Sequence, residues 1–191
     1  MFELARDEVI KIVPVASAAL IAVLGWVATY FHKWHFDKKA SKLDRVNKQL
    51  RELYGPLYAI LMANNATWEA FWKNYRPSHG KNSYFGNNVN VTDEEKEVWR
   101  NWMENVFEPF NAETEKLILK NIDLLESDHI PNSFIGALAH IAAYKAVLSN
   151  WQRSDFSNHV SVNEWPSQEL LATVKPEYEK LRALQRKLMG A

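Results

Sequence analysis

The residues best suited to chemistry are Arg153 and His159, which have five residues between them in the stretch NWQRSDFSNH. An arginine can stabilise the charge of a phosphate in a transition state while a histidine transfers protons, so this pair suits metal-independent cleavage of RNA. In the alternative interpretation the pair is structural, and Arg153, Asp155 and His159 cap helices and order a loop. The sequence leaves both interpretations open.

Other polar residues are candidates for binding a ligand or a metal. His32 and His35 are three residues apart on one predicted helix face, but polar rings are expected at a membrane interface, so we predict no metal site. His140 lies in the predicted central helix and is expected to be a hydrogen-bonded core histidine. Arg76 and Lys81 are candidate ligands for the phosphate of a nucleotide or of RNA.

Several enzyme classes are excluded or disfavoured by what the sequence lacks. It has no cysteine, which rules out a disulfide framework, thiolate catalysis and cysteine-ligated metal sites. The glycine-rich nucleotide-binding motifs, the zinc-protease motif and the serine-hydrolase motif are also missing. We therefore expect no cofactor, and the sequence argues against an ordinary enzyme.

An apolar run of twenty residues without a charge extends from Ile12 to Phe31. It would hold any functional site in the rest of the chain beside a membrane. A helix of this length matches the roughly 30 Å hydrocarbon core of a bilayer. A cleaved signal peptide and a buried core helix are the alternatives, but the run begins after an acidic stretch and ends in bulky aromatic residues. The sequence predicts one N-terminal transmembrane helix.

The flanks of this run predict its orientation. Residues 33–51 hold seven basic and two acidic groups, whereas residues 1–32 hold two basic and three acidic groups. Positive charge beside a span stays in the cytoplasm, so the tail at residues 1–11 is expected outside and the C-terminal domain inside. The predicted location is the bacterial inner membrane, crossed once. The residues expected at the inner interface are Trp26, Tyr30, Phe31, Trp34 and Phe36, followed by Lys33, Lys38, Lys39 and Lys42.

Small residues recur along one face of the predicted span at spacings of four, three and four: Ala18, Ala22, Gly25 and Thr29. Transmembrane helices associate by close backbone approach, which small side chains permit. The pattern predicts a homo-oligomer. In the alternative interpretation these residues only reflect the ordinary composition of membrane spans.

A second pattern follows the span, with apolar residues at spacings of three and four: Leu43, Val46, Leu50, Leu53, Leu57 and Ile60. It is typical of a coiled-coil seam or of an amphipathic helix packed on its own domain, and the sequence leaves both open. Gly55-Pro56 interrupts it, and we expect a break or kink there with a new helix from Pro56.

The rest of the chain is predicted to be helical, which makes the fold all-α, a transmembrane helix followed by a cytoplasmic helical bundle. The expected divisions are a tail at 1–11, the span with its interfacial end at 12–36, a basic juxtamembrane helix at 37–55 and the domain at 56–191. Thr92 with Glu95 predicts a capping box, and Pro109 is expected to bend or end the helix that it opens. The other predicted helices are 56–75, 111–126, 132–151, 166–174 and 176–189.

The strings LYGPLYAIL, FWKNYRP, WRNWMENVFEPFN, HIAAYKAVLSNW and DFSNH resemble those of a widespread family of small bacterial proteins with one N-terminal span and a helical cytoplasmic domain. This resemblance covers about residues 45–170 and implies an architecture but no particular activity. The spacing of Arg153 and His159 resembles the motif of the HEPN family of helical ribonucleases. More distantly, the architecture is similar to the HEPN-like membrane-pore accessory protein of type VI-B CRISPR systems, which implies ring assembly and membrane perturbation during phage defence.

These patterns lead to three hypotheses. The first is a homo-oligomeric inner-membrane protein that gates or perturbs the membrane in antiphage defence, with the lipid bilayer and its own copies as partners. The second is a membrane-tethered sensor of RNA or of a nucleotide second messenger, using Arg76, Lys81, Arg153 and His159. The third is a HEPN-like ribonuclease acting through Arg153 and His159. A CRISPR effector is a further candidate partner.

Overall fold

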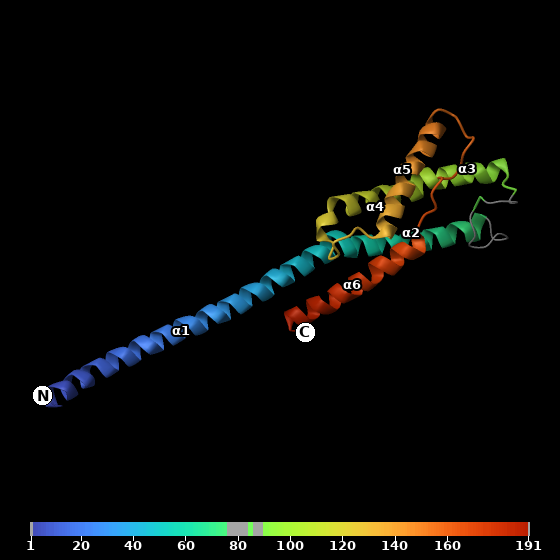
Figure 1. Ribbon diagram of the computed structural model, residues 1–191. Helices are drawn as coiled ribbons and strands as arrows, with labels where there is room; N and C mark the ends of the chain where they lie inside the picture. Colours follow the sequence, from blue (N-terminus) through green and yellow to red (C-terminus); the bar gives the residue numbers. More distant parts are fainter. Residues whose placement is uncertain (1, 76–83, 86–89, 191) are drawn as a thin grey trace. The chain divides into compact units, whose positions relative to one another are not determined.

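The computed structural model of the protein describes the backbone of residues 2–75, 84–85 and 90–190, and the side chains of these residues from Leu20 onward. Every regular element in these ranges is a helix, as the sequence predicts (Figure 1). The chain divides into two compact units, residues 1–45 and residues 46–191.

The first unit consists of helix α1, Phe2–Gln49, whose last residues belong to the second unit. From Leu20 to Phe36 its large apolar side chains are exposed on all sides of the helix: Leu20, Ile21, Val23, Leu24, Trp26, Tyr30, Phe31, Trp34 and Phe36. Among the described residues, no helix combines the length and the apolar character needed to cross a membrane. The predicted span at residues 12–31 begins among residues whose side chains are not described.

The second unit is a bundle of helices. After a π-helical turn, η1 (Leu50–Tyr54), come α2 (Gly55–Tyr75), α3 (Asp93–Trp102), a second π-helical turn η3 (Met103–Phe107), α4 (Glu108–Lys120), the 3-10 turn η4 (Ile122–Leu124), α5 (Asn132–Gln152) and α6 (Ser167–Met189). Helix α2 packs against both α4 and α6, and α5 packs against α4 and α6. In Figure 1, α5 (orange) crosses these helices at a steep angle.

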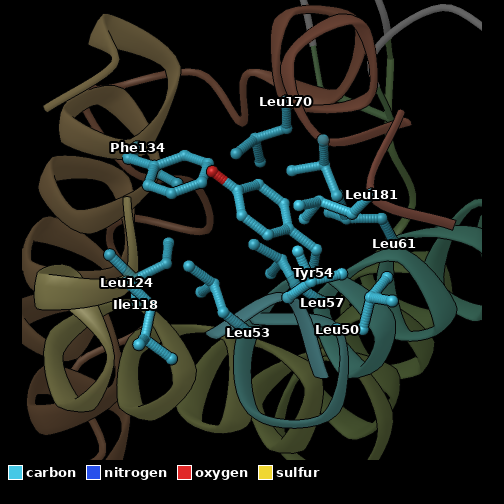
Figure 2. Close-up of a cluster of buried hydrophobic side chains, with 13 residues drawn as sticks. Leu50, Leu53, Tyr54, Leu57, Leu61, Ile118, Leu124, Phe134, Leu170 and Leu181 are labelled. Atoms are coloured by element: carbon cyan, nitrogen blue, oxygen red, sulfur yellow. The ribbon is translucent and has the colours of Figure 1, made fainter. Parts of the chain in front are cut away.

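The first of two cores in this unit is largely aliphatic and lies where η1 and α2 meet α4, α5 and α6. Figure 2 shows Tyr54 reaching into it with its hydroxyl group directed toward Phe134 and Leu170. Burial, together with the nearby carboxylates of Glu177 and Glu126, raises the pKa of Tyr54 to about 12. The side chain therefore stays neutral within the core.

The second core is aromatic and joins the far end of α2 to α3, η3 and α5. Phe71 is fully buried at its centre, with ring centroids 5.1 to 5.9 Å from those of Tyr84, Trp99, Trp102 and Phe107. Offset and edge-to-face pairs of this kind add to the stabilisation that comes from buried area. The capping box predicted from the sequence is present, because Thr92 Oγ1 accepts from the Glu95 N–H and the Glu95 carboxylate accepts from the Thr92 N–H.

The chain passes two prolines by forming π-helical turns. The Gly55 N–H donates to Leu50 O, and the Glu108 N–H donates to Met103 O, so each turn ends directly before Pro56 or Pro109. A new α-helix begins at each of these points, α2 at Gly55 and α4 at Glu108. This confirms the helix start expected at Pro56 to within one residue, and the helix that Thr92 caps ends before Pro109. The π-helical turns keep the chain helical through both prolines. A π-helical turn is wider than an α-helical turn and takes up the space that the proline ring needs. Proline lacks a backbone N–H, but an N–H in the first turn of a helix has no acceptor within that helix.

The expected division into two helices at residues 166–174 and 176–189 is wrong, because α6 is continuous and holds Pro176 within it. Pro176 cannot donate to the carbonyl of Ala172 four residues earlier. Both residues are exposed, so water can satisfy that carbonyl.

The apolar residues that follow the predicted span pack against other helices of the same chain. Val46, Leu50, Leu53 and Leu57 are buried in the aliphatic core. Of the two interpretations of this pattern, the structure therefore has the amphipathic helix packed on its own domain.

Candidate functional site

The loop between α5 and α6 is attached to the aromatic core at the backbone of His159. Its carbonyl oxygen accepts from Trp99 Nε1 at 2.8 Å and from the Tyr144 hydroxyl at 2.7 Å. Trp151 Nε1 donates to the neighbouring carbonyl of Asn158 at 2.8 Å. Three buried aromatic residues thus fix the position of His159 through its backbone, which leaves its side chain free to meet other groups.

The His159 ring contacts Arg100 of α3, with 3.1 Å between Nε2 and the Arg100 Nη1. A guanidinium can only donate hydrogen bonds, so Nε2 must be the acceptor and carry no proton. The ring also stacks on Phe85, with 5.2 Å between centroids. Burial, followed by the positive charges of Arg100 and Lys96, lowers the pKa of His159 from its ordinary value of 6.5. The site therefore holds a neutral histidine with its proton on Nδ1.

The structure places Arg153 differently from His159. The Arg153 guanidinium is exposed and donates to Asn150 Oδ1 at 2.6 Å, one turn back along α5. The chain then turns through Ser154, whose φ of +62° lies in the left-handed region, and the Asp155 carboxylate accepts from the Ser157 N–H. Asp155 thus orders the loop locally, and Arg153 is bonded to the end of α5.

Arg100 is the functional candidate that sequence reasoning missed. It lies 59 residues before His159, so no local spacing connects the two. Its guanidinium also lies over the Phe156 ring, 4.4 Å from the centroid. Its position beside Trp99 in the string WRNW was the one available signal, because a polar residue next to a buried tryptophan sits at the edge of a core.

Next to this pair is an open groove of about 340 Å³, lined by Arg100, Trp151 and Phe156 and by two carboxylates, Glu97 and Glu104. The carboxylates lie about one turn to either side of Arg100 on α3 and η3. Their negative charges oppose the approach of a phosphate. The contact between Arg100 and His159 is therefore better suited to ordering the loop than to binding a phosphodiester.

The remaining predicted residues are placed as follows. His140 Nδ1 lies 2.6 Å from the carbonyl oxygen of Asn163, which confirms the expected hydrogen bond, but the residue is only half-buried and is not part of either core. Burial lowers its pKa. Arg76 and Lys81 lie outside the described residues. No three histidine or acidic side chains in the described part of the chain form a group that could hold a metal ion.

The small residues of α1 form an open surface where they are described. Ala22, Gly25 and Thr29 are exposed, and a Cβ added at Gly25 would meet nothing within 4 Å. Thr29 Oγ1 donates to the Gly25 carbonyl at 2.8 Å, so its hydroxyl group is satisfied within the helix. Ala18 lies in α1 among the residues whose side chains are not described.

Comparisons of the chain with protein-family models, with curated proteins and with solved structures give no match.

Proposed function

We propose that the protein is a homo-oligomeric, single-pass protein of the bacterial inner membrane that gates or perturbs that membrane, in defence against phage. Its N-terminal tail lies outside and its helical domain lies in the cytoplasm. Helix α1 holds the protein in the bilayer, and the small residues Ala18, Ala22, Gly25 and Thr29 bring the spans of several copies together.

One observation carries this proposal: the large apolar side chains of Leu20–Phe36 surround α1 and are exposed, with Ile21 and Trp26 each at 70%. A helix that is apolar on all sides is stable where something apolar covers it. The uncharged run continues back to Ile12, which gives it the length of a bilayer core. Lipid is the covering that fits both features.

The aromatic and basic residues at the end of the run support the orientation. The Lys38 ammonium lies 3.7 Å from the centroid of the Trp34 ring. Such a pair suits the headgroup region, where the ring is partly in the apolar layer and the ammonium reaches the lipid phosphates. The basic excess at residues 33–51 favours the cytoplasmic side for this end.

The proposal is tested in vesicles loaded with potassium and containing the purified full-length protein. Wild type is expected to release potassium, and replacement of residues 12–31 by an unrelated monomeric span of equal length should abolish the release. If the replacement leaks as fast as wild type, the span is only an anchor. If an oligomeric wild type releases no potassium, the gating proposal fails.

The ribonuclease alternative has one specific observation in its favour, the contact between Arg100 and His159. In that alternative Arg100 takes the role predicted for Arg153 from its spacing to His159. Cleavage of a labelled RNA should then be lost in Arg100→Ala and in His159→Ala but kept in Arg153→Ala. Equal cleavage by all three variants, or none by wild type, removes the alternative.

A further inference from the structure

A second groove, lined by two arginines, lies between the start of the domain and α6. This groove has a volume of about 410 Å³ and is lined by residues of the last turn of α1, η1, Gly55 and α6. Two arginines, Arg51 and Arg182, line it, and none of the described residues that line it is acidic. In this respect it differs from the groove beside Arg100.

The hydrogen bonds at this groove fix the orientation of two side-chain amides. Arg182 Nη1 donates to Gln185 Oε1 at 2.6 Å, so that oxygen must face the guanidinium. Gln185 Nε2 then donates to Asn47 Oδ1 at 2.6 Å. The series ends at Asn47, whose remaining polar group is its NH₂, a donor.

The lining is therefore rich in donors. The side chains that line it include those of Asn47 and Tyr178, which carry an NH₂ and a hydroxyl group, and two guanidinium groups, each with several N–H bonds. Arg51 uses one N–H on the neighbouring carboxylate of Glu52, 3.0 Å away, but the Arg51 side chain is 73% exposed and such a surface pair is weak. A doubly charged anion can displace the Glu52 carboxylate from Arg51.

The geometry points to a binding site for a phosphate-bearing anion, held by Arg51 and Arg182 with Asn47 and Tyr178 as further donors. Arginine matches the oxygens of phosphate with paired N–H groups. The phosphate can come from a lipid headgroup or from a soluble compound, and the chemistry of recognition is the same for both. The site belongs to residues 46–191 alone, so it does not depend on α1 crossing a membrane.

The glycine in the lining explains why the groove is open there. A Cβ at Gly55 would lie 2.4 Å from the Leu50 carbonyl oxygen and 4.0 Å from the Tyr178 ring. The π-helical turn and the groove therefore depend on the same glycine. A ligand held between Arg51 on η1 and Arg182 on α6 would join this turn to the C-terminal helix.

The test is isothermal titration of inorganic phosphate into the full-length protein in a nonionic detergent at constant ionic strength. Arg51→Gln and Arg182→Gln are each expected to weaken binding about tenfold, the scale of one charged hydrogen bond. Lys48→Gln and Arg186→Gln are matched controls, since both residues are exposed on the same helices but do not line the groove.

The two sources are separated by adding lipid to the micelles. If the natural occupant is a headgroup, phosphatidylglycerol will weaken phosphate binding and phosphatidylcholine at the same concentration will weaken it less. Equal phosphate affinity in both lipids assigns the site to a soluble phosphate compound. Absence of phosphate binding by wild type, or equal weakening by the groove and control substitutions, overturns the site.

Discussion

Gly55 and Leu50 face one another across a π-helical turn so closely that a methyl group on Gly55 would lie 2.4 Å from the Leu50 carbonyl oxygen. The same carbonyl accepts the Gly55 N–H. The residue that ends this turn must therefore be glycine, for a reason of space and not of backbone angle, since its φ is −66°.

Gly55→Ala is expected to destabilise the domain by more than about 1 kcal/mol, because the Leu50 carbonyl must move or the turn must rewind. Urea unfolding of the full-length protein, followed by tryptophan fluorescence, measures the loss. Gly136→Ala in α5 is the matched control, since its new Cβ would lie 3.5 Å from Pro166, an ordinary contact. That substitution should be neutral or stabilising by up to about 1 kcal/mol. Equal effects of the two would contradict the account of the turn.

Asn121 supports the same turn from the end of α4. Its buried side-chain amide donates to the Glu52 carbonyl at 2.8 Å and to the Leu117 carbonyl at 3.0 Å. Pro56 cannot donate to that Glu52 carbonyl. Asn121→Ala should therefore cost about 1–3 kcal/mol of unfolding free energy, the cost of leaving a buried acceptor unpaired. Asn105→Ala, on an exposed surface, should cost less than about 0.5 kcal/mol, and an equal cost would remove the special role of Asn121.

These elements show where prediction from sequence succeeded and where it could not. The capping box of Thr92 and Glu95 was predictable because its partners are three residues apart. The π-helical turn before Pro56 was not, because it depends on space around Gly55 and on Asn121, 69 residues from Glu52. The site was predictable only in part: His159 lies at an ordered position, but its partner Arg100 comes from a different helix.

His159 makes the stability of the domain depend on pH. Its folded-state pKa lies below the ordinary value of 6.5, because of burial and of Arg100 and Lys96, with Asp93 opposing them. The unfolded chain then binds more protons than the folded chain as the pH falls through about 6.5, so stability is lost on acidification. His140 acts in the same direction.

The check is the urea midpoint at pH 7 and pH 5. The midpoint should fall at pH 5, and His159→Gln should reduce the difference, leaving the part that comes from His140. His129→Gln, in the exposed loop before α5, is the control. If His159→Gln leaves the pH dependence as large as in wild type, the ring does not titrate in the way that its contacts require.

The small residues of α1 predict the state of association. Gly25→Leu should convert a detergent-solubilised oligomer toward monomer, because a bulky side chain separates helix backbones that must approach closely, at a cost of about 1–2 kcal/mol per contact. Light scattering measures the mass of the complex. Val27→Leu, two residues after Gly25 and so on the opposite side of the same helix, should leave the mass unchanged. A monomeric wild-type protein would contradict the prediction that copies assemble through α1.

Since the natural chain has no cysteine, the position of α1 in the bilayer can be measured directly with single introduced cysteines. A thiol reacts with a maleimide as the thiolate, which does not form within hydrocarbon. In native membranes treated with a membrane-permeant maleimide, Ala22→Cys and Ala28→Cys should stay unlabelled until the membrane is dissolved and the protein denatured, whereas Ser41→Cys should label at once. Labelling of Ala22→Cys and Ala28→Cys as fast as Ser41→Cys would show that α1 lies in water and would contradict the proposal.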